Sequence, residues 1–119
     1  MLKTDWLIRR FESPDESREF EKGRFEIVRI GGLTVGRARY EPGWKWSLHV
    51  APATGTRTCQ VAHVGLVVSG HAKVLMDGGG ELDLRAGDLF EIAPGHDSWV
   101  VGDEPYVSLH FLGADDYAR

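Results

Sequence analysis

Residues 87–96 read GDLFEIAPGH and are the most informative segment of the chain. Gly87-Asp88 is typical of a tight turn, and Pro94-Gly95 provides a second turn a few residues later. Between them, segment 89–92 is apolar and short enough for one β-strand. This pattern predicts short strands joined by tight turns, with His96 directly after the second turn.

The same pattern extends from this segment in both directions. From residue 24 onward, apolar residues recur with a period of about two, as in strands with one buried face. Glycine, with 15 of the 119 residues, mostly separates the apolar runs. We therefore predict an all-β sandwich or barrel, with strands at residues 25–30, 33–40, 44–50, 61–68, 71–76, 81–84, 89–92, 98–101 and 106–112.

A helix signal is confined to the N-terminal part of the chain. Ser13 at the N-cap, Pro14 at the first helical position and Glu16 at the third form a capping box, and Gly23 follows where a helix would end. We expect a short helix within residues 13–22. The expected organisation is an N-terminal arm, residues 1–23, followed by one β-barrel domain, residues 24–119.

Composition and charge exclude several classes of function. With 42% hydrophobic and 27% charged residues, the chain is suited to one globular domain. A net charge of −4 without a basic cluster disfavours nucleic acids and anionic membranes as partners, and no apolar run is long enough for a membrane span. The single cysteine, Cys59, excludes an internal disulfide and fits the reducing cytoplasm, where we expect the protein.

Two motifs of this sequence resemble those of the cupin superfamily, whose members are small double-sheet jelly rolls. In the first, Gly43 is followed by five residues and His49, and His63 is followed by six residues and Gly70. The second motif is segment 87–96. The resemblance spans residues 43–101. Within it, segment 94–99 resembles a subgroup of small bacterial cupins of unassigned function. It implies a double-stranded β-helix, the cupin jelly-roll barrel.

The ligand positions of the family are altered in this sequence. Ala51 stands where the family has the second histidine of its His-x-His pair, and His63 stands at the glutamate position. Ser98 takes the place of the histidine of the second motif, with His96 two residues earlier. Segment 52–62 is also longer than the usual gap. The usual set of three histidines and one glutamate is therefore replaced.

Imidazole and thiol groups that converge on one point are good ligands for divalent transition metals. The resemblance places His63 inside the barrel, and the alternation of side chains along a strand then turns Cys59 inward as well. We predict a metal site formed by His49, His63 and His96, in which Cys59 is either a fourth ligand or a buried apolar residue. The expected metal is Zn, Fe, Ni or Cu.

Further residues are expected around this site. Asp97 either orients the His96 ring or forms an Asx turn. Ser98 and His110 are expected to line the pocket. Trp99 either closes the pocket mouth or packs on the outside of the barrel.

The direction of His49 also determines the expected direction of two tryptophans. If His49 faces inward from a strand, Trp44 and Trp46 face outward, because their positions have the opposite parity. Large exposed indoles need a cover, which is either the N-terminal arm or a second copy of the chain. The resemblance to cupins favours a homodimer.

Two functions of different classes fit these observations. The first is a metal-dependent enzyme of dioxygenase, isomerase or lyase type that acts on a small polar or anionic molecule held in the barrel. The second is a non-catalytic small-molecule binding or sensing module without metal. The sequence does not distinguish a general base, and fold alone does not choose between the two functions.

Overall fold

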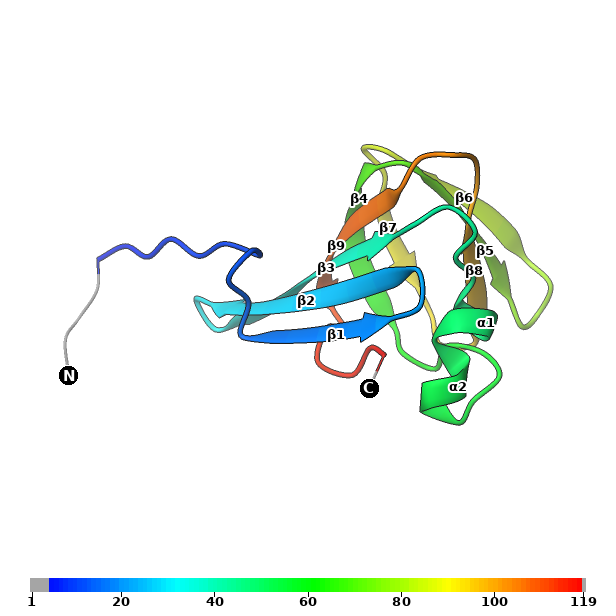
Figure 1. Ribbon diagram of the computed structural model, residues 1–119, viewed down its shortest axis with the longest axis horizontal. Coiled ribbons are helices and arrows are strands. Elements are labelled where there is room, and N and C mark those ends of the chain that lie inside the picture. Colours follow the sequence, from blue (N-terminus) through cyan, green and yellow to red (C-terminus); the bar gives the residue numbers. More distant parts are fainter. Residues whose placement is uncertain (1–4, 119) are drawn as a thin grey trace.

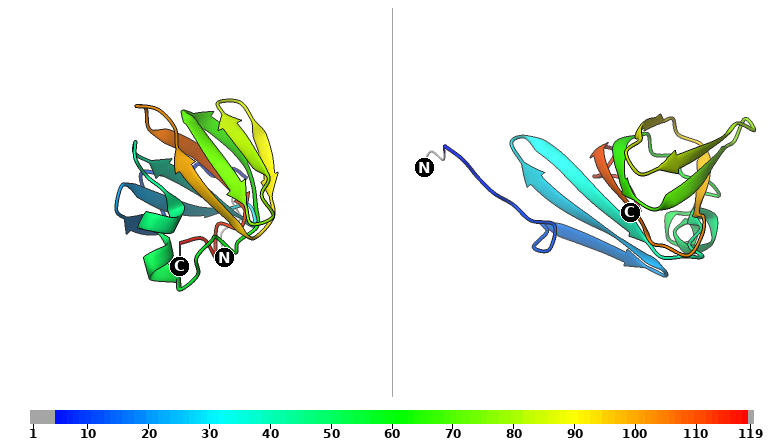
Figure 2. Two further views of the ribbon diagram at one scale, coloured as in Figure 1. Left: turned by 90° about the vertical axis from the view of Figure 1, so that its right-hand side faces the viewer. Right: turned by 90° about the horizontal axis from the view of Figure 1, so that it is seen from above.

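The computed structural model describes residues 5–118 and shows two antiparallel sheets that face each other (Figure 1, Figure 2). The larger sheet has the strand order β1-β2-β3-β9-β4-β7, and the smaller has the order β6-β5-β8. The strands are β1 Glu16–Phe20, β2 Gly23–Ile30, β3 Leu33–Tyr40, β4 His63–Ser69, β5 His71–Met76, β6 Glu81–Arg85, β7 Leu89–Ile92, β8 His96–Val100 and β9 Tyr106–Leu112. The predicted all-β jelly roll is confirmed.

Turn residues explain why most strands lie where the sequence predicts them. Strands β3, β5, β7 and β9 have the predicted bounds. Gly31 and Gly32, with φ angles of 59° and 79°, turn the chain between β2 and β3. Such positive φ angles are readily available to glycine and rare for other residues. Glycines at positive φ also lie near other strand ends, so the strand limits are encoded locally.

The helix predicted within residues 13–22 is wrong, because this segment contains strand β1. Strand β1 pairs with β2 along its whole length, from Glu16 opposite Ile27 to Phe20 opposite Gly23. The Phe20 ring packs against Tyr40, at a centroid distance of 6.1 Å. A capping box contributes only about 1 kcal/mol, so the ladder and the partly buried aromatic side chain outweigh it.

The strand predicted at residues 44–50 is also wrong, because the chain forms two single helical turns here. They are α1 Trp46–His49 and α2 Ala51–Thr54. Asp97 of β8 stabilises α1 by accepting hydrogen bonds from the Ser47 backbone N–H (3.0 Å) and hydroxyl (2.8 Å). Neither turn, nor any other helix within the described residues, is long and apolar enough to cross a membrane.

The altered path of this segment places Trp44 and Trp46 inside the barrel. Their exposed fractions are 1% and 2%, and the Trp44 ring stacks on Tyr40 at a centroid distance of 3.7 Å. The expectation that both indoles face outward is therefore wrong. They are covered, but the cover is the core of their own chain.

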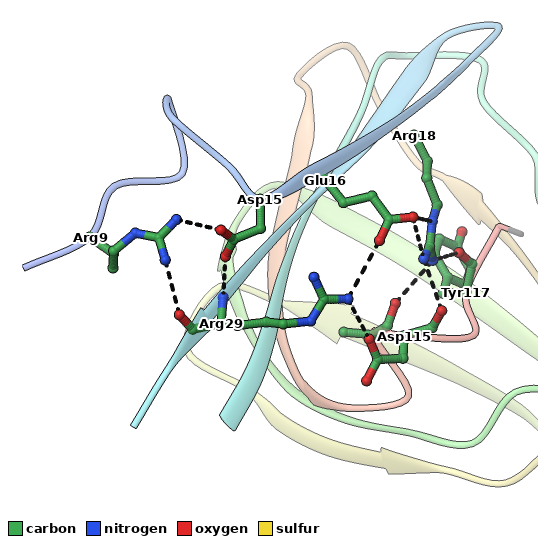
Figure 3. Close-up of polar contacts among 8 residues, drawn as sticks. Arg9, Asp15, Glu16, Arg18, Arg29, Asp115 and Tyr117 are labelled. Atoms are coloured by element: carbon green, nitrogen blue, oxygen red, sulfur yellow. Dashed lines mark hydrogen bonds and ion pairs between the residues drawn. The ribbon is translucent and has the colours of Figure 1, made fainter. Parts of the chain in front are cut away.

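Arg18 of β1 holds the C-terminal turn, residues 113–118, against the larger sheet (Figure 3). Its guanidinium also binds the Glu16 carboxylate at 2.8 Å. Arg29 extends the network, because it lies 3.5 Å from Glu16 and 2.9 Å from Asp115. The main contacts of Arg18 are hydrogen bonds donated to three backbone carbonyl groups of the turn, those of Ala114, Asp115 and Tyr117.

Replacing Arg18 by alanine is expected to lower the free energy of unfolding by about 2–3 kcal/mol, because hydrogen bonds from a charged donor to partly buried carbonyl groups are lost. Urea unfolding at pH 7 measures this change. The matched control is Arg39→Ala, which breaks a 3.0 Å pair with Glu41 in which both side chains are 45% exposed. That change should cost less than about 1 kcal/mol. Equal losses in the two variants would contradict the role of Arg18.

Candidate metal centre

Three of the four predicted ligands meet at one point inside the barrel. The ligand atoms of Cys59, His63 and His96 lie within 4.8 Å of one another, and all three residues are buried. Cys59 Sγ is 3.5 Å from His63 Nε2. The rings of His63 and His96 are 5.3 Å apart between centroids. The structure therefore provides one thiol and two imidazoles in a single cluster.

Backbone pairing between remote segments brings these residues together. The Cys59 N–H donates to the His96 carbonyl at 2.7 Å, and the Gly95 N–H donates to the Cys59 carbonyl at 2.7 Å. His63 begins β4 and pairs with Ile92 of β7. Since β4 belongs to the larger sheet and β8 to the smaller one, the cluster draws its ligands from both sheets.

The His96 ring is held in the form that leaves one nitrogen available. Its Nδ1 lies 2.9 Å from the Ala93 carbonyl oxygen. A carbonyl only accepts hydrogen bonds, so Nδ1 carries the proton and Nε2 keeps its lone pair. Metal-binding histidines commonly have this arrangement. Two alternative roles are expected for Asp97 from the sequence, orienting the His96 ring or forming an Asx turn. The Asp97 carboxylate instead binds Ser47 of α1.

Residues at the far side of the cluster extend the site. The His110 ring, from β9, lies 5.1 Å from the His63 ring, and the Tyr117 ring lies 5.3 Å from it. His110 Nε2 is 2.9 Å from the Ser108 hydroxyl. The Tyr117 hydroxyl is hydrogen-bonded to that of Tyr40 at 2.6 Å. His63 is therefore the central residue of a buried polar cluster.

Sequence reasoning missed the two tyrosines. Tyr40 could have been found, because it shares the parity of the buried residue Ala38 in β3. Tyr117 lies in an irregular turn and has no local signal. Its position follows from the Arg18 contacts to that turn.

The structure does not bring His49 to the other three predicted ligands, Cys59, His63 and His96. It lies in α1, where its Nδ1 is 3.0 Å from the Lys45 backbone nitrogen, and its Nε2 is 3.3 Å from the Glu21 carboxylate. The inward parity assigned to His49 required a continuous strand, which is absent in this segment. Trp99 lies outside the cavity lining, with Lys45 Nζ at 5.4 Å from its ring centroid.

A cavity of about 40 Å³ adjoins the cluster. About 10–15 Å³ is needed per water molecule, so this volume admits a few non-hydrogen atoms. Ser98 and His110, both predicted to line the pocket, are among its residues. The lining, which has no Lys, Arg, Asp or Glu among the described residues, consists of Tyr40, Trp44, Trp46, His63, Ala72, Val74, Leu84, Phe90, Ile92, His96, Ser98, Tyr106, Ser108, His110 and Tyr117.

Burial keeps the titratable groups of this site neutral at pH 7. Burial, together with the neighbouring His110 and His96, lowers the pKa of His63 to about 2. Burial also lowers the pKa of His110 to about 4 and that of His96 below its usual value. The pKa of the Cys59 thiol is raised to about 11 for the same reason. Neutral imidazoles are the ligating form, whereas the thiol must lose its proton to bind a metal.

Comparison with known proteins gives structural matches only. No family model matches the sequence, and no curated protein does. A mutant of oxalate decarboxylase from Bacillus subtilis matches with 25% identity and a TM-score of 0.62, covering 87% of this chain and 29% of its own. An 11S allergen from Cocos nucifera matches with 15% identity and a TM-score of 0.61, covering 88% of this chain and 33% of its own.

A third match has a similar size. It is a structure of unknown function from Rhizobium leguminosarum, with 21% identity and a TM-score of 0.55, covering 88% of this chain and 95% of its own. The present chain thus spans less than a third of the decarboxylase and nearly the whole of the Rhizobium chain. All three neighbours have the cupin fold, and residues 5–118 of this chain have the same fold.

Proposed function

We propose that this chain is a metal-binding cupin that holds a small polar or anionic molecule beside its metal. The observation that carries the proposal is the buried cluster of Cys59, His63 and His96 next to a cavity. Buried polar groups normally have partners, yet His63 Nδ1 has none among the described residues. A buried cluster that is built from both sheets and has an unpartnered nitrogen is suited to a ligand that the chain does not itself supply.

The donor set fits a borderline transition metal. Two ligands of one tetrahedral zinc ion lie about 3.5 Å apart, and Cys59 Sγ lies 3.5 Å from His63 Nε2. Imidazole and thiolate favour Zn, Fe, Ni or Cu, whereas Mg, Ca and Mn favour oxygen ligands. The decarboxylase from Bacillus subtilis has Mn(II) centres. The cluster here contains no carboxylate, which supports a softer metal.

When bound, such a metal acts as a Lewis acid toward an oxygen atom of its ligand. The residues of the chain would hold and orient that ligand. Ala93 fixes the His96 ring, and the paired hydroxyl groups of Tyr40 and Tyr117 sit beside His63. Burial raises the pKa of both tyrosines well above 10, so they donate hydrogen bonds at pH 7. A dioxygenase, isomerase or lyase activity remains part of this proposal.

One observation favours the second candidate, a binding or sensing module without catalysis. The cavity lining has no Asp or Glu among the described residues, and its histidines are hydrogen-bonded or enclosed by aromatic rings. General acid–base catalysis usually relies on a group whose pKa is near the working pH. No carboxylate in the described lining could serve as a general base, so ligand binding without turnover is the alternative outcome.

The homodimer stays a prediction, with a different basis. Trp44 and Trp46 no longer support it, since both are buried. Exposed apolar side chains on the larger sheet support it instead, with Val68 at 50% and Leu89 at 77% exposure. A cytoplasmic location also stays a prediction, supported by the unpaired Cys59.

Protein expressed and purified with excess zinc is expected to contain one metal ion per chain, measured by elemental analysis. His63→Ala and His96→Ala should each weaken zinc binding by at least about tenfold, since each removes one ligand. His49→Ala should retain zinc, because His49 lies outside the cluster. His71→Ala is the surface control, since His71 pairs with Asp83 at 2.7 Å.

Circular dichroism and urea unfolding of the same samples check that each variant is folded. Full zinc occupancy with unchanged affinity in folded His63→Ala would contradict the metal centre. Loss of zinc from folded His49→Ala would instead support the metal site expected from the sequence, which includes His49.

The stability of the metal-free protein is expected to fall as the pH is lowered from 7 to 5. The folded-state pKa values of His63 and His110, about 2 and about 4, lie below the value of about 6.5 in the unfolded chain. The unfolded state therefore binds more protons, so this stability is present above pH 6.5 and is lost below it. Each histidine contributes a slope approaching about 1.4 kcal/mol per pH unit.

Urea unfolding in the presence of a chelator, between pH 7 and pH 5, measures this slope. Most carboxylates titrate at lower pH values. His63→Asn should reduce the slope. A free energy of unfolding that is constant from pH 7 to pH 5 would contradict the burial of neutral imidazoles.

A further inference from the structure

We propose that the cavity binds a small carboxylate through the indole N–H groups of Trp44 and Trp46. The inference rests on the proposed function, because it names the ligand class of the same cavity. It depends on three features of the described residues. These are two donors without acceptors, a lining without fixed charge, and a small volume.

The donors are the most direct observation. The Nε1 atoms of Trp44 and Trp46 are both buried and have no hydrogen-bond partner. Both side chains line the cavity. An indole N–H can only donate, and a buried donor without an acceptor costs about 1–3 kcal/mol. Two such donors beside one cavity are readily explained if the acceptor belongs to a bound molecule.

The lack of charged side chains in the described lining restricts the chemical class of that molecule. No Asp or Glu lines the cavity among the described residues, so no carboxylate of this lining lies against a bound anion. No Lys or Arg lines it either, and burying an unbalanced anion is costly. The positive charge would come from a metal held by Cys59, His63 and His96. A ligand with acceptor oxygens on two sides can then face the indoles and the metal together.

Size and shape restrict the class further. A volume of about 40 Å³ admits only a few non-hydrogen atoms. The rings of Tyr40 and Trp44 are stacked with an interplanar angle of 3°, and such a wall is suited to a flat group. The smallest carboxylates, formate and acetate, meet both conditions. Larger acids would require the cavity to expand.

Contacts from another element hold one of the two donors in place. Trp46 is the first residue of α1, and Asp97 binds the next residue, Ser47, through both carboxylate oxygens. Asp97 is therefore a positioning residue for the Trp46 indole. Its carboxylate lies outside the cavity lining.

The test is a titration of the ¹⁵N-labelled full chain with sodium formate and sodium acetate, followed through the indole N–H resonances in NMR spectra. Sodium chloride at the same ionic strength is the control. The resonances of Trp44 and Trp46 should shift, whereas those of Trp6 and Trp99 should not. Trp6 is 78% exposed, and Trp99 lies outside the cavity lining. Zinc-loaded protein should bind formate at least about tenfold more tightly than metal-free protein.

Matched variants test the donors themselves. Trp44→Phe and Trp46→Phe each keep an aromatic ring and remove the N–H. Each should weaken formate binding by about tenfold or more, read from the remaining indole resonance. Trp99→Phe is the control and should bind formate like the unaltered chain. Thermal unfolding of all variants checks that they are folded.

Each outcome has a defined meaning. Formate binding that shifts neither cavity indole, binding that is unchanged in folded Trp46→Phe, or no binding to either form of the protein overturns the carboxylate site. Zinc content is measured on the same samples. Bound zinc without indole shifts overturns this inference alone, and indole shifts in a protein that never binds zinc overturn the metal centre alone.

Discussion

The backbone bridge between Cys59 and His96 is the contact on which the site depends. It consists of hydrogen bonds at 2.7 Å in both directions between the segment before β4 and the turn at Gly95. Because β4 and β8 belong to different sheets, this bridge ties the two layers together at the edge where the polar side chains point inward. Without it, the thiol of Cys59 and the imidazole of His96 would not be held in one cluster.

Among the described residues, the interior of this barrel combines an apolar core with a cluster of buried polar side chains. Residues such as Phe25, Ile27 and Val74 fill the space between the sheets. His63, His96, Ser108 and His110 are buried as deeply, and desolvation keeps the histidines neutral. A buried polar group with an unsatisfied atom costs stability. Their concentration in one cluster, next to a cavity, is typical of a site retained for binding.

Two contacts between remote segments complete the site. Arg18 fixes the C-terminal turn that carries Tyr117 to the side of His63. Asp97 fixes the helical turn that carries Trp46 to the cavity. In both cases a charged side chain at the periphery binds backbone groups, and an aromatic side chain is thereby placed inside. Two side chains that do not line the cavity, Arg18 and Asp97, thus help to position aromatic residues that do.

Local pattern alone predicted the all-β architecture and four strands with their bounds, and the resemblance to cupins added the inward direction of His63 and His96. These features depend on glycine turns and on the alternation of side chains, which are properties of neighbouring residues. The helix at residues 13–22, the strand at residues 44–50 and the ligand role of His49 depended on weak local signals. Pairing of β1 with β2 and the Asp97 contact to Ser47 overrode the first two. The β1–β2 pairs join residues 3 to 11 positions apart, and the Asp97 contact joins residues 50 positions apart. Both outweigh a local capping preference of about 1 kcal/mol. Only the tertiary structure therefore decided which aromatic and imidazole groups surround the cavity.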